Sequence, residues 1–213
     1  MITTTKAIVL NQKKYGDTSL ICNLFSYDYG KIAIIAKSAR IIKNPLGAIL
    51  QPLNYIECVY YFKKSRNIQT IKEASMIHKY YNLENNYNKM NRAYVIIDII
   101  NHINYAESPS KIIFRLVKKT LDNMDESNEK LIDILFVFFQ IQCLIYLGYH
   151  PNVISCVRCG VKLHDAKFDF SLGQLSCNRC CKEKTDLDVE CFNIMRFLIK
   201  THIDDIDNKF NYQ

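Results

Sequence analysis

The stretch Leu147-Gly148-Tyr149-His150-Pro151, which runs on to Cys156-Val157-Arg158-Cys159-Gly160, is the most informative junction of the chain. Before it, residues 131–147 are apolar nearly all round, which predicts a buried helix that ends at Gly148. After it the hydrophobic periodicity stops, and five of the nine cysteines lie within residues 151–184. The junction therefore predicts a change from a helical domain to a cysteine-rich module.

Two Cys-x-x-Cys pairs in this module form the strongest chemical signal. The first pair is Cys156 and Cys159, and the second, after seventeen residues, is Cys177 and Cys180. Two residues between thiolates allow both sulfurs of a turn to reach one ion, and two such pairs form a tetrahedral site that suits Zn²⁺. Because four thiolates leave no open position, we expect one structural zinc ion rather than a catalytic one.

Other uses of these thiols stay open at the level of sequence. Cys181 or His164 could replace a ligand, although only Cys180 keeps the two-residue spacing. A thiol redox enzyme that uses Cys177 and Cys180 is a rival, which would require a βαβ context. Residues 1–6 lack an apolar segment after a basic start. We therefore expect a reducing cytoplasm, where cysteines of this kind indicate metal rather than disulfides.

Residues 1–78 are predicted to form one domain of short strands separated by turns. Their regular spacing favours a small barrel or a sandwich. Cys22 and Cys58 fall within apolar segments and are expected in its core. The candidate strands cover residues 7–10, 19–26, 31–37, 53–62 and 67–73.

Residues 79–213 are predicted to be a helical domain, interrupted by the cysteine-rich insert at about 151–184. Ser108 and Pro109 form an expected helix start, and Thr185 or Asp186 is expected to cap the last helix. The apolar stretch before Gly148 contains charged and amide side chains, so it predicts a helix of a bundle rather than a membrane span. The candidate helices cover residues 90–103, 112–121, 131–147 and 189–199.

Positive charge is concentrated in the first domain. The whole chain has 28 Lys and Arg against 21 Asp and Glu, whereas residues 1–80 alone have 12 against 4. Loop cations beside aromatic rings on a small barrel would form a groove for a nucleic-acid backbone with stacked bases. A solvated basic face with core tyrosines is the alternative. The cations are Lys13, Lys14, Lys31, Lys37, Arg40, Lys43, Lys63, Lys64 and Arg66, and the tyrosines are Tyr15, Tyr27, Tyr29, Tyr60 and Tyr61.

No sequence pattern of an enzyme site is present. The chain has no glycine-rich phosphate loop, no His-Glu-x-x-His and no nucleophile elbow, and its five histidines are scattered. We therefore expect no catalytic residues.

Taken together, these segments resemble the bacterial recombination mediator family RecO. The resemblance rests on the strand at residues 7–10, the turn at residues 15–17, the basic segment Lys37-Ser38-Ala39-Arg40 and, above all, the junction at residues 147–160. It implies an α+β protein with an N-terminal OB-fold barrel at 1–78 and a helical domain at 79–213 that carries an inserted four-cysteine zinc finger. In one departure, Ile41 and Ile42 stand where family members usually have further basic residues.

The resemblance also implies a DNA repair function without enzymatic turnover. Such a protein would bind single- and double-stranded DNA and anneal complementary strands in the bacterial cytoplasm, at the nucleoid. With RecR it would help load recombinase onto strands coated by single-strand-binding protein, whose acidic tail is a further expected partner. A partner-binding adaptor without annealing activity is the alternative. The expected phosphate contacts are Lys37, Arg40 and Lys43, then Lys31, Lys63, Lys64 and Arg66.

Overall fold

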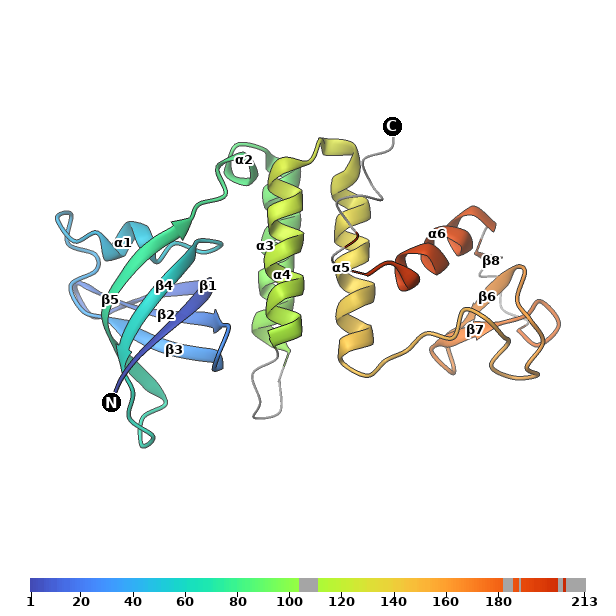
Figure 1. Ribbon diagram of the computed structural model, residues 1–213, viewed down its shortest axis with the longest axis horizontal. Helices are drawn as coiled ribbons and strands as arrows, with labels where there is room; N and C mark the ends of the chain where they lie inside the picture. Colours follow the sequence, from blue (N-terminus) through green and yellow to red (C-terminus); the bar gives the residue numbers. More distant parts are fainter. Residues whose placement is uncertain (104–110, 182–185, 188, 203–204, 206–213) are drawn as a thin grey trace. The chain divides into compact units, whose positions relative to one another are not determined.

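The structure is a computed structural model that describes residues 1–103, 111–181, 186–187, 189–202 and 205 of the 213-residue chain. The chain divides into two compact units, residues 1–136 and residues 137–213. Figure 1 shows a barrel followed by helices in the first unit, and a small sheet with a helix beside it in the second. The boundary expected near residue 78 marks the change from strands to helices, and as a domain boundary it stays a prediction.

Five strands of the first unit close into a barrel in the order β1-β2-β3-β5-β4. Neighbouring strands are antiparallel except β3 and β5, which are parallel. Closure depends on β1, whose first half pairs with β4 and whose second half pairs with β2. The predicted OB-fold barrel is confirmed, and the sandwich alternative is wrong. The strands are β1 (Ile2–Tyr15), β2 (Ser19–Ser26), β3 (Gly30–Ala36), β4 (Tyr55–Tyr61) and β5 (Ile68–His78).

The interior of the barrel follows from the alternation of side chains along each strand. Leu20, Cys22 and Leu24 of β2 are buried, and so are Cys58 and Tyr60 of β4. Burial raises the pKa of the Cys22 and Cys58 thiols to about 12, so both stay protonated and unreactive. The prediction that these two cysteines are core residues is confirmed.

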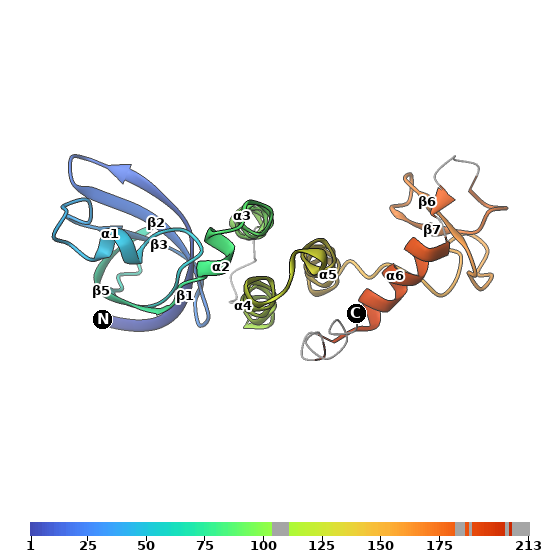
Figure 2. The same ribbon diagram turned by 90° about the horizontal axis from the view of Figure 1, so that it is seen from above.

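Helices of the first unit pack on one another and on the barrel. The predicted helices near 90–103 and 112–121 are confirmed as α3 (Tyr87–His102) and α4 (Lys111–Glu126), which lie side by side (Figure 2). Phe114 of α4 joins them to the barrel, because its ring lies 5.5 Å from those of Phe25 and Tyr27. Ser108 and Pro109 lie outside the described residues. Three single-turn helices were not predicted from the sequence: α1 (Leu46–Ile49), α2 (Tyr81–Glu84) and η1 (Glu129–Leu131).

The predicted helix at 131–147 is confirmed as α5 (Ile132–Tyr146), and Gly148 follows it with a positive φ of 93°. The boundary between the two units falls within this helix. Cys143 of this helix is buried. In the part of the chain that the structure describes, no helix has the length and apolar character needed to cross a membrane.

The second unit adds a three-stranded sheet in the order β7-β6-β8 and the helix α6 (Val189–Lys200). Its strands are β6 (Ala166–Asp169), β7 (Gln174–Ser176) and β8 (Asp186–Leu187). The prediction that Asp186 caps the last helix is wrong, because Asp186 pairs with Lys167 in this sheet. Thr185, the other expected cap, lies outside the described residues. The sheet was not predicted, because strands this short are too brief to show an alternation of apolar and polar residues.

Candidate metal centre and nucleic-acid interface

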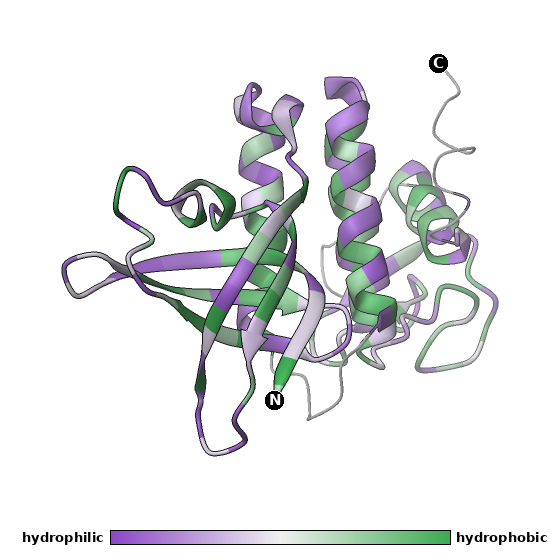
Figure 3. Cartoon of the chain, turned by 60° about the vertical axis from the view of Figure 1, so that its left-hand side comes forward, coloured by the Kyte–Doolittle hydropathy of each residue, from purple (hydrophilic) through white to green (hydrophobic). Residues whose placement is uncertain are grey.

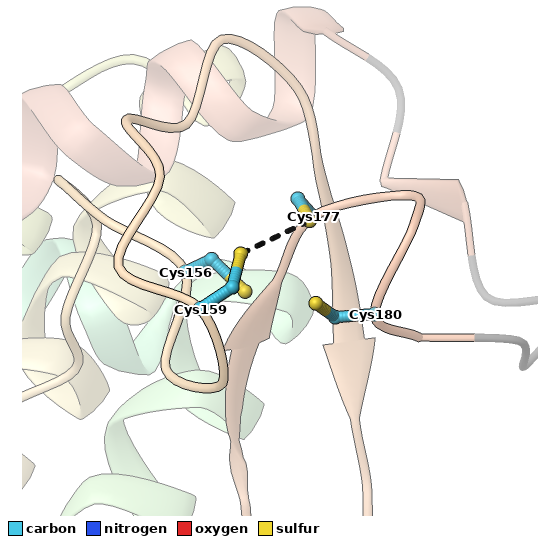
Figure 4. Close-up of side chains that lie close together, drawn as sticks. All are labelled: Cys156, Cys159, Cys177 and Cys180. Atoms are coloured by element: carbon cyan, nitrogen blue, oxygen red, sulfur yellow. Dashed lines mark hydrogen bonds between the residues drawn. The ribbon is translucent and has the colours of Figure 1, made fainter.

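The four cysteines predicted as ligands meet in the second unit, with their sulfurs turned toward one another (Figure 4). All four sulfurs lie within 4.8 Å of one another, and Cys159 Sγ is 3.8 Å from Cys177 Sγ. Metal–sulfur bonds of about 2.3 Å in a tetrahedron place the sulfurs about 3.8 Å apart. The group therefore has the donor set and the size of a four-thiolate metal site.

Backbone hydrogen bonds shape the two Cys-x-x-Cys turns. In the first turn the Gly160 N–H donates to the Cys156 carbonyl at 2.9 Å, and Gly160 adopts a φ of +73°, which favours glycine. In the second turn the Cys180 N–H donates to the Cys177 carbonyl at 3.0 Å. The Val157 N–H donates to the Leu175 carbonyl at 3.1 Å, which joins the first turn to β7. Local turns and one cross-link thus bring the pairs together.

A side chain inside each turn binds a carboxylate of the module. Arg158, between the first two cysteines, donates from Nε to Asp169 at 2.7 Å. Asn178, between the second two, donates to Asp165 at 2.7 Å. Bonds from Arg158 and Ser171 hold the pKa of the Asp169 carboxyl at about 2, so this nearly buried group stays ionised. Neither acid was predicted from the sequence, because its contact with Arg158 or Asn178 forms only when the module folds.

The thiols of Cys156, Cys177 and Cys180 differ strongly in their proton affinities. Burial opposes ionisation of Cys156, but hydrogen bonds from the N–H groups of Cys177, Cys159 and Arg158 lower its pKa to about 6. The pKa of Cys177 is also lowered by backbone N–H groups, against the effect of burial. Hydrogen bonds to the neighbouring sulfurs of Cys159 and Cys177 raise the pKa of Cys180 to about 12. Protons are thus shared within the group, and a bound cation would stabilise the thiolates together.

The two alternative ligands do not belong to this group, as far as the described residues show. Cys181 is buried, with its sulfur 4.0 Å from the Phe168 carbonyl oxygen, and His164 is exposed. Behind the sulfurs lies a small core, in which Phe192 of α6 is fully buried. The other buried members of this core besides Cys156 and Cys177 are Val153, Leu163, Ala166 and Leu175.

The cations predicted to contact DNA are brought together in two separate loops of the barrel. The first, named here the basic loop, covers residues 37–45 after β3 and exposes Lys37, Arg40 and Lys43. It lies against the β1–β2 turn, because the Arg40 N–H donates to the Thr18 carbonyl at 2.8 Å. A pocket of about 540 Å³ beside it is lined by residues that include Lys14, Arg40 and Ile42. The tip of the basic loop, which precedes α1 in the chain, is hydrophobic (Figure 3). Ile42 in this loop is fully exposed.

The basic loop has an ordered backbone. Asn44 donates to the Ser38 carbonyl at 3.1 Å, and Ser38 itself takes a φ of +57°. Gly47 of α1 lies so close to the loop that an added Cβ would be 2.4 Å from the Ala39 carbonyl oxygen. A glycine is therefore required here for a close approach, and the charges of the loop are presented by a fixed framework.

The second set lies in residues 62–67 between β4 and β5 and exposes Lys63, Lys64 and Arg66. We name this segment the β4–β5 loop. The buried Gln69 holds it, since its side chain accepts from the Lys63 N–H at 2.9 Å and donates to the Arg66 carbonyl at 2.6 Å. The loop leads to Ile68, which pairs with Ala33 in β3, whereas the basic loop follows Ala36 at the end of that strand. The two sets therefore flank β3 at different places.

Two residues expected at the interface are occupied elsewhere. Lys31 Nζ donates to the carbonyls of Asn101 and Ile103 at 2.9 and 2.7 Å, at the C-terminal end of α3, and burial lowers its pKa. The expectation that Tyr60 is available for stacking is wrong, because its side chain is only 1% exposed inside the barrel. Tyr15, Tyr29 and Tyr61 are exposed.

Family models match both parts of the chain. The model described as "Recombination protein O N terminal" matches residues 1–80, and "Recombination protein O C terminal" matches residues 85–210. Together they cover the barrel, the helices of the described residues other than the single-turn α2, and the four cysteines.

Curated relatives agree with these matches. The chain is 27% identical to the DNA repair protein RecO of Caldicellulosiruptor bescii, over 92% of this chain and 78% of the relative. It is 32% identical to that of Chlorobium limicola over 83% and 67%, and 34% identical to that of Salinibacter ruber over 71% and 58%. The solved asparaginyl-tRNA synthetase of Entamoeba histolytica overlaps with a TM-score of 0.30 and 16% identity, over 78% of this chain and 36% of that one, which supports no conclusion.

Proposed function

The chain belongs to the recombination protein O family of bacterial DNA repair proteins, and from this we propose that its barrel binds single- and double-stranded DNA and promotes annealing of complementary strands. The family consists of recombination mediators without enzymatic turnover, so we assign no catalytic residue. The observation that carries the proposal is the pair of exposed cationic loops on a closed barrel.

Annealing requires no bond chemistry, only that two mutually repelling polyanions be held together. Cations that contact phosphates release condensed counterions, which favours binding and screens one strand from the other. In OB-folds the face of the second and third strands and the loops beside it bind oligonucleotides. We infer that a strand follows this face of the barrel, between the basic loop and the β4–β5 loop.

The proposed phosphate contacts are those whose ammonium and guanidinium groups are exposed. Lys31 is set apart from them, because its ammonium group binds the end of α3. We propose that its main role is to hold that helix against the barrel. The exposed contacts are Lys37, Arg40 and Lys43 in the basic loop, and Lys63, Lys64 and Arg66 in the β4–β5 loop.

A strand-annealing assay tests this function. Purified protein is expected to accelerate annealing of complementary oligonucleotides, and the double variant Lys37→Glu/Arg40→Glu is expected to lose most of that acceleration. A protein that binds DNA-repair partners without accelerating annealing would instead be the adaptor considered above, and the annealing proposal would be wrong.

We further propose that Cys156, Cys159, Cys177 and Cys180 bind one Zn²⁺ ion with a structural role. The support is the sulfur-only donor set and the spacing of the sulfurs, which match a closed tetrahedral site. The ion would neutralise thiolates that otherwise compete for protons. It would also fasten the two turns to the small sheet, as a scaffold for the second part of the protein.

The remaining proposals follow from the family. We propose an OB-fold domain at 1–78, a helical domain at 79–213 with the zinc finger at about 151–184, and action at the nucleoid in the cytoplasm. We also propose RecR and the acidic tail of single-strand-binding protein as partners in loading recombinase. Co-purification of the chain with each partner, with and without DNA, tests these contacts separately from annealing.

A further inference from the structure

We propose that the pocket between Tyr29 and the β4–β5 loop binds an unstacked nucleobase of a single DNA strand, while the cations of that loop bind the flanking phosphates. The inference rests on the proposed DNA binding and assigns a base-binding site within it. The pocket has a volume of about 370 Å³, which is in the range of about 300–1,000 Å³ typical of small-molecule sites. It is lined by Asp28, Tyr29, Lys31, Ile32, Ala33, Tyr60, Phe62, Asn67 and Gln69.

Two aromatic rings of the lining are partly exposed and therefore accessible to a ligand. Tyr29 is 49% exposed and Phe62 is 40% exposed. Every base has a π face, so a base can stack on such rings irrespective of sequence. The buried Tyr60 supports one of them, because its ring lies edge-on to Tyr29 with centroids 6.4 Å apart.

The backbone that carries both rings is held by hydrogen bonds of the barrel. The Tyr29 N–H donates to the hydroxyl of the buried Ser26 at 3.0 Å, and that hydroxyl donates to the Gly30 carbonyl at 2.9 Å. The Phe62 N–H donates to the Met1 carbonyl at 2.8 Å. A base entering this pocket meets rings on a backbone that is already held, so binding requires little ordering of the main chain.

The charges indicate how a nucleotide would be oriented. Asp28 lines the pocket, and its carboxylate already accepts from the Thr5 hydroxyl at 3.1 Å and pairs with Lys111 Nζ at 3.6 Å. The ammonium group of Lys31, the cation of the lining, is bonded to two backbone carbonyls. The lining therefore offers a phosphate no unbonded cation, whereas the remaining lone pairs of the Asp28 carboxylate can accept from the amino group of a base such as cytosine. Lys63, Lys64 and Arg66 lie in the loop that joins Phe62 and Asn67, both of which line the pocket. The base is thus expected inside and the phosphates at the rim.

The test compares affinities for a cytosine oligonucleotide and for the same oligonucleotide with abasic residues. The wild-type protein is expected to bind the base-bearing strand about tenfold or more tightly than the abasic one. Tyr29→Ala is expected to weaken binding of the base-bearing strand about tenfold and to leave binding of the abasic strand unchanged. Tyr29→Phe should keep the wild-type preference. The matched control is Tyr87→Ala, which removes a 76% exposed tyrosine at the start of α3.

Several outcomes would overturn the base pocket. One is equal weakening of both strands by Tyr29→Ala, which would mean that the residue supports backbone contacts only. Another is an equal wild-type affinity for both strands, which would leave the proposed DNA binding intact but remove the base site. Wild-type protein that binds neither strand would instead contradict the proposed function itself.

A second measurement needs no variant and so avoids the risk of misfolding. A 2-aminopurine base placed in the oligonucleotide is expected to change its fluorescence on binding wild-type protein, because the base moves from a stack with neighbouring bases to a stack with an aromatic ring of the pocket. Photo-cross-linking from an iodinated pyrimidine is expected to label Tyr29 or Phe62. Cross-links confined to the second unit would refute the pocket.

Discussion

Replacement of Cys177 by serine is expected to abolish zinc binding and to unfold the module that surrounds the site. Cys177 contributes one of four sulfurs within 4.8 Å, and serine offers a hydroxyl that stays protonated where a thiolate is required. Structural zinc sites contribute about 10–16 kcal/mol of binding free energy that appears as folding free energy. Whole domains are stable by only about 5–15 kcal/mol. The free energy lost with the ion would therefore be as large as, or larger than, the stability of the module, so we expect the module to unfold.

The small size of the core behind the sulfurs supports this expectation. Apart from Cys156 and Cys177 of the four-sulfur group, five buried residues form it: Val153, Leu163, Ala166, Leu175 and Phe192. Scaffolds with so small a core usually depend on a disulfide or a metal. The barrel has its own core and should be unaffected.

The measurement combines metal content with hydrogen exchange on the full chain under reducing conditions. Wild-type protein is expected to contain about one zinc per chain and to protect residues 153–169 and 189–200. In Cys177→Ser both should be lost, while protection of β2 and β3 stays. The matched control is Cys181→Ser, four residues further along, whose buried sulfur lies outside the group. Retention of zinc and protection in Cys177→Ser would refute the reasoning, and so would equal loss in Cys181→Ser.

Three further predictions concern the barrel and its helices. The Lys37→Glu/Arg40→Glu variant should weaken single-stranded DNA binding and reduce the slope of log affinity against log salt by about 1.4, because each lost phosphate contact contributes about 0.7. The control is Lys130→Glu. An unchanged slope, or an equal change in the control, would contradict the assignment. Lys89→Met should lower the free energy of unfolding by about 1.5–3 kcal/mol, measured by urea denaturation, because the buried ammonium group bonds to two carbonyls at and after the end of α4 at 3.0 and 2.6 Å; DNA affinity should not change. Gly47→Ala should weaken DNA binding although alanine favours helices, because its Cβ would displace the backbone of the basic loop; unaltered affinity and thermal midpoint would show that the loop adjusts freely.

Much of the fold follows from patterns that are local in sequence. Alternating apolar residues give β2 and β3 nearly the bounds that were predicted, and three helices follow from their 3.6-residue period. The four cysteines were identified by spacing alone, because a two-residue gap in a turn places both sulfurs on one side. The short sheet that contains Asp186 was not predicted, because strands of two to four residues depend on their pairing partners rather than on their own sequence pattern.

The roles of individual cations and rings depended on contacts that are distant in sequence. Lys31 and Arg40 are equally basic in the sequence, yet the Lys31 ammonium group bonds to two carbonyls at the end of α3. Arg40 instead lies exposed at the β1–β2 turn, with one hydrogen bond from its guanidinium group to the Gly16 carbonyl at 3.1 Å. Tyr29 and Tyr60 are both barrel tyrosines, and only the register of β4 places Tyr60 inside.

The sequence by itself thus determined the strand-rich region, the helical region, the four-cysteine group and the excess of positive charge, because each depends on spacing or composition within a short segment. Closure of the strands into a barrel rather than a sandwich depended on their pairing. Tertiary structure alone decided which charges are free to meet a polyanion. It also brought Tyr29 and Phe62 to one pocket, which depends on how the strands of a closed barrel pair. Strand pairing joins residues far apart in the chain, and no local pattern records it.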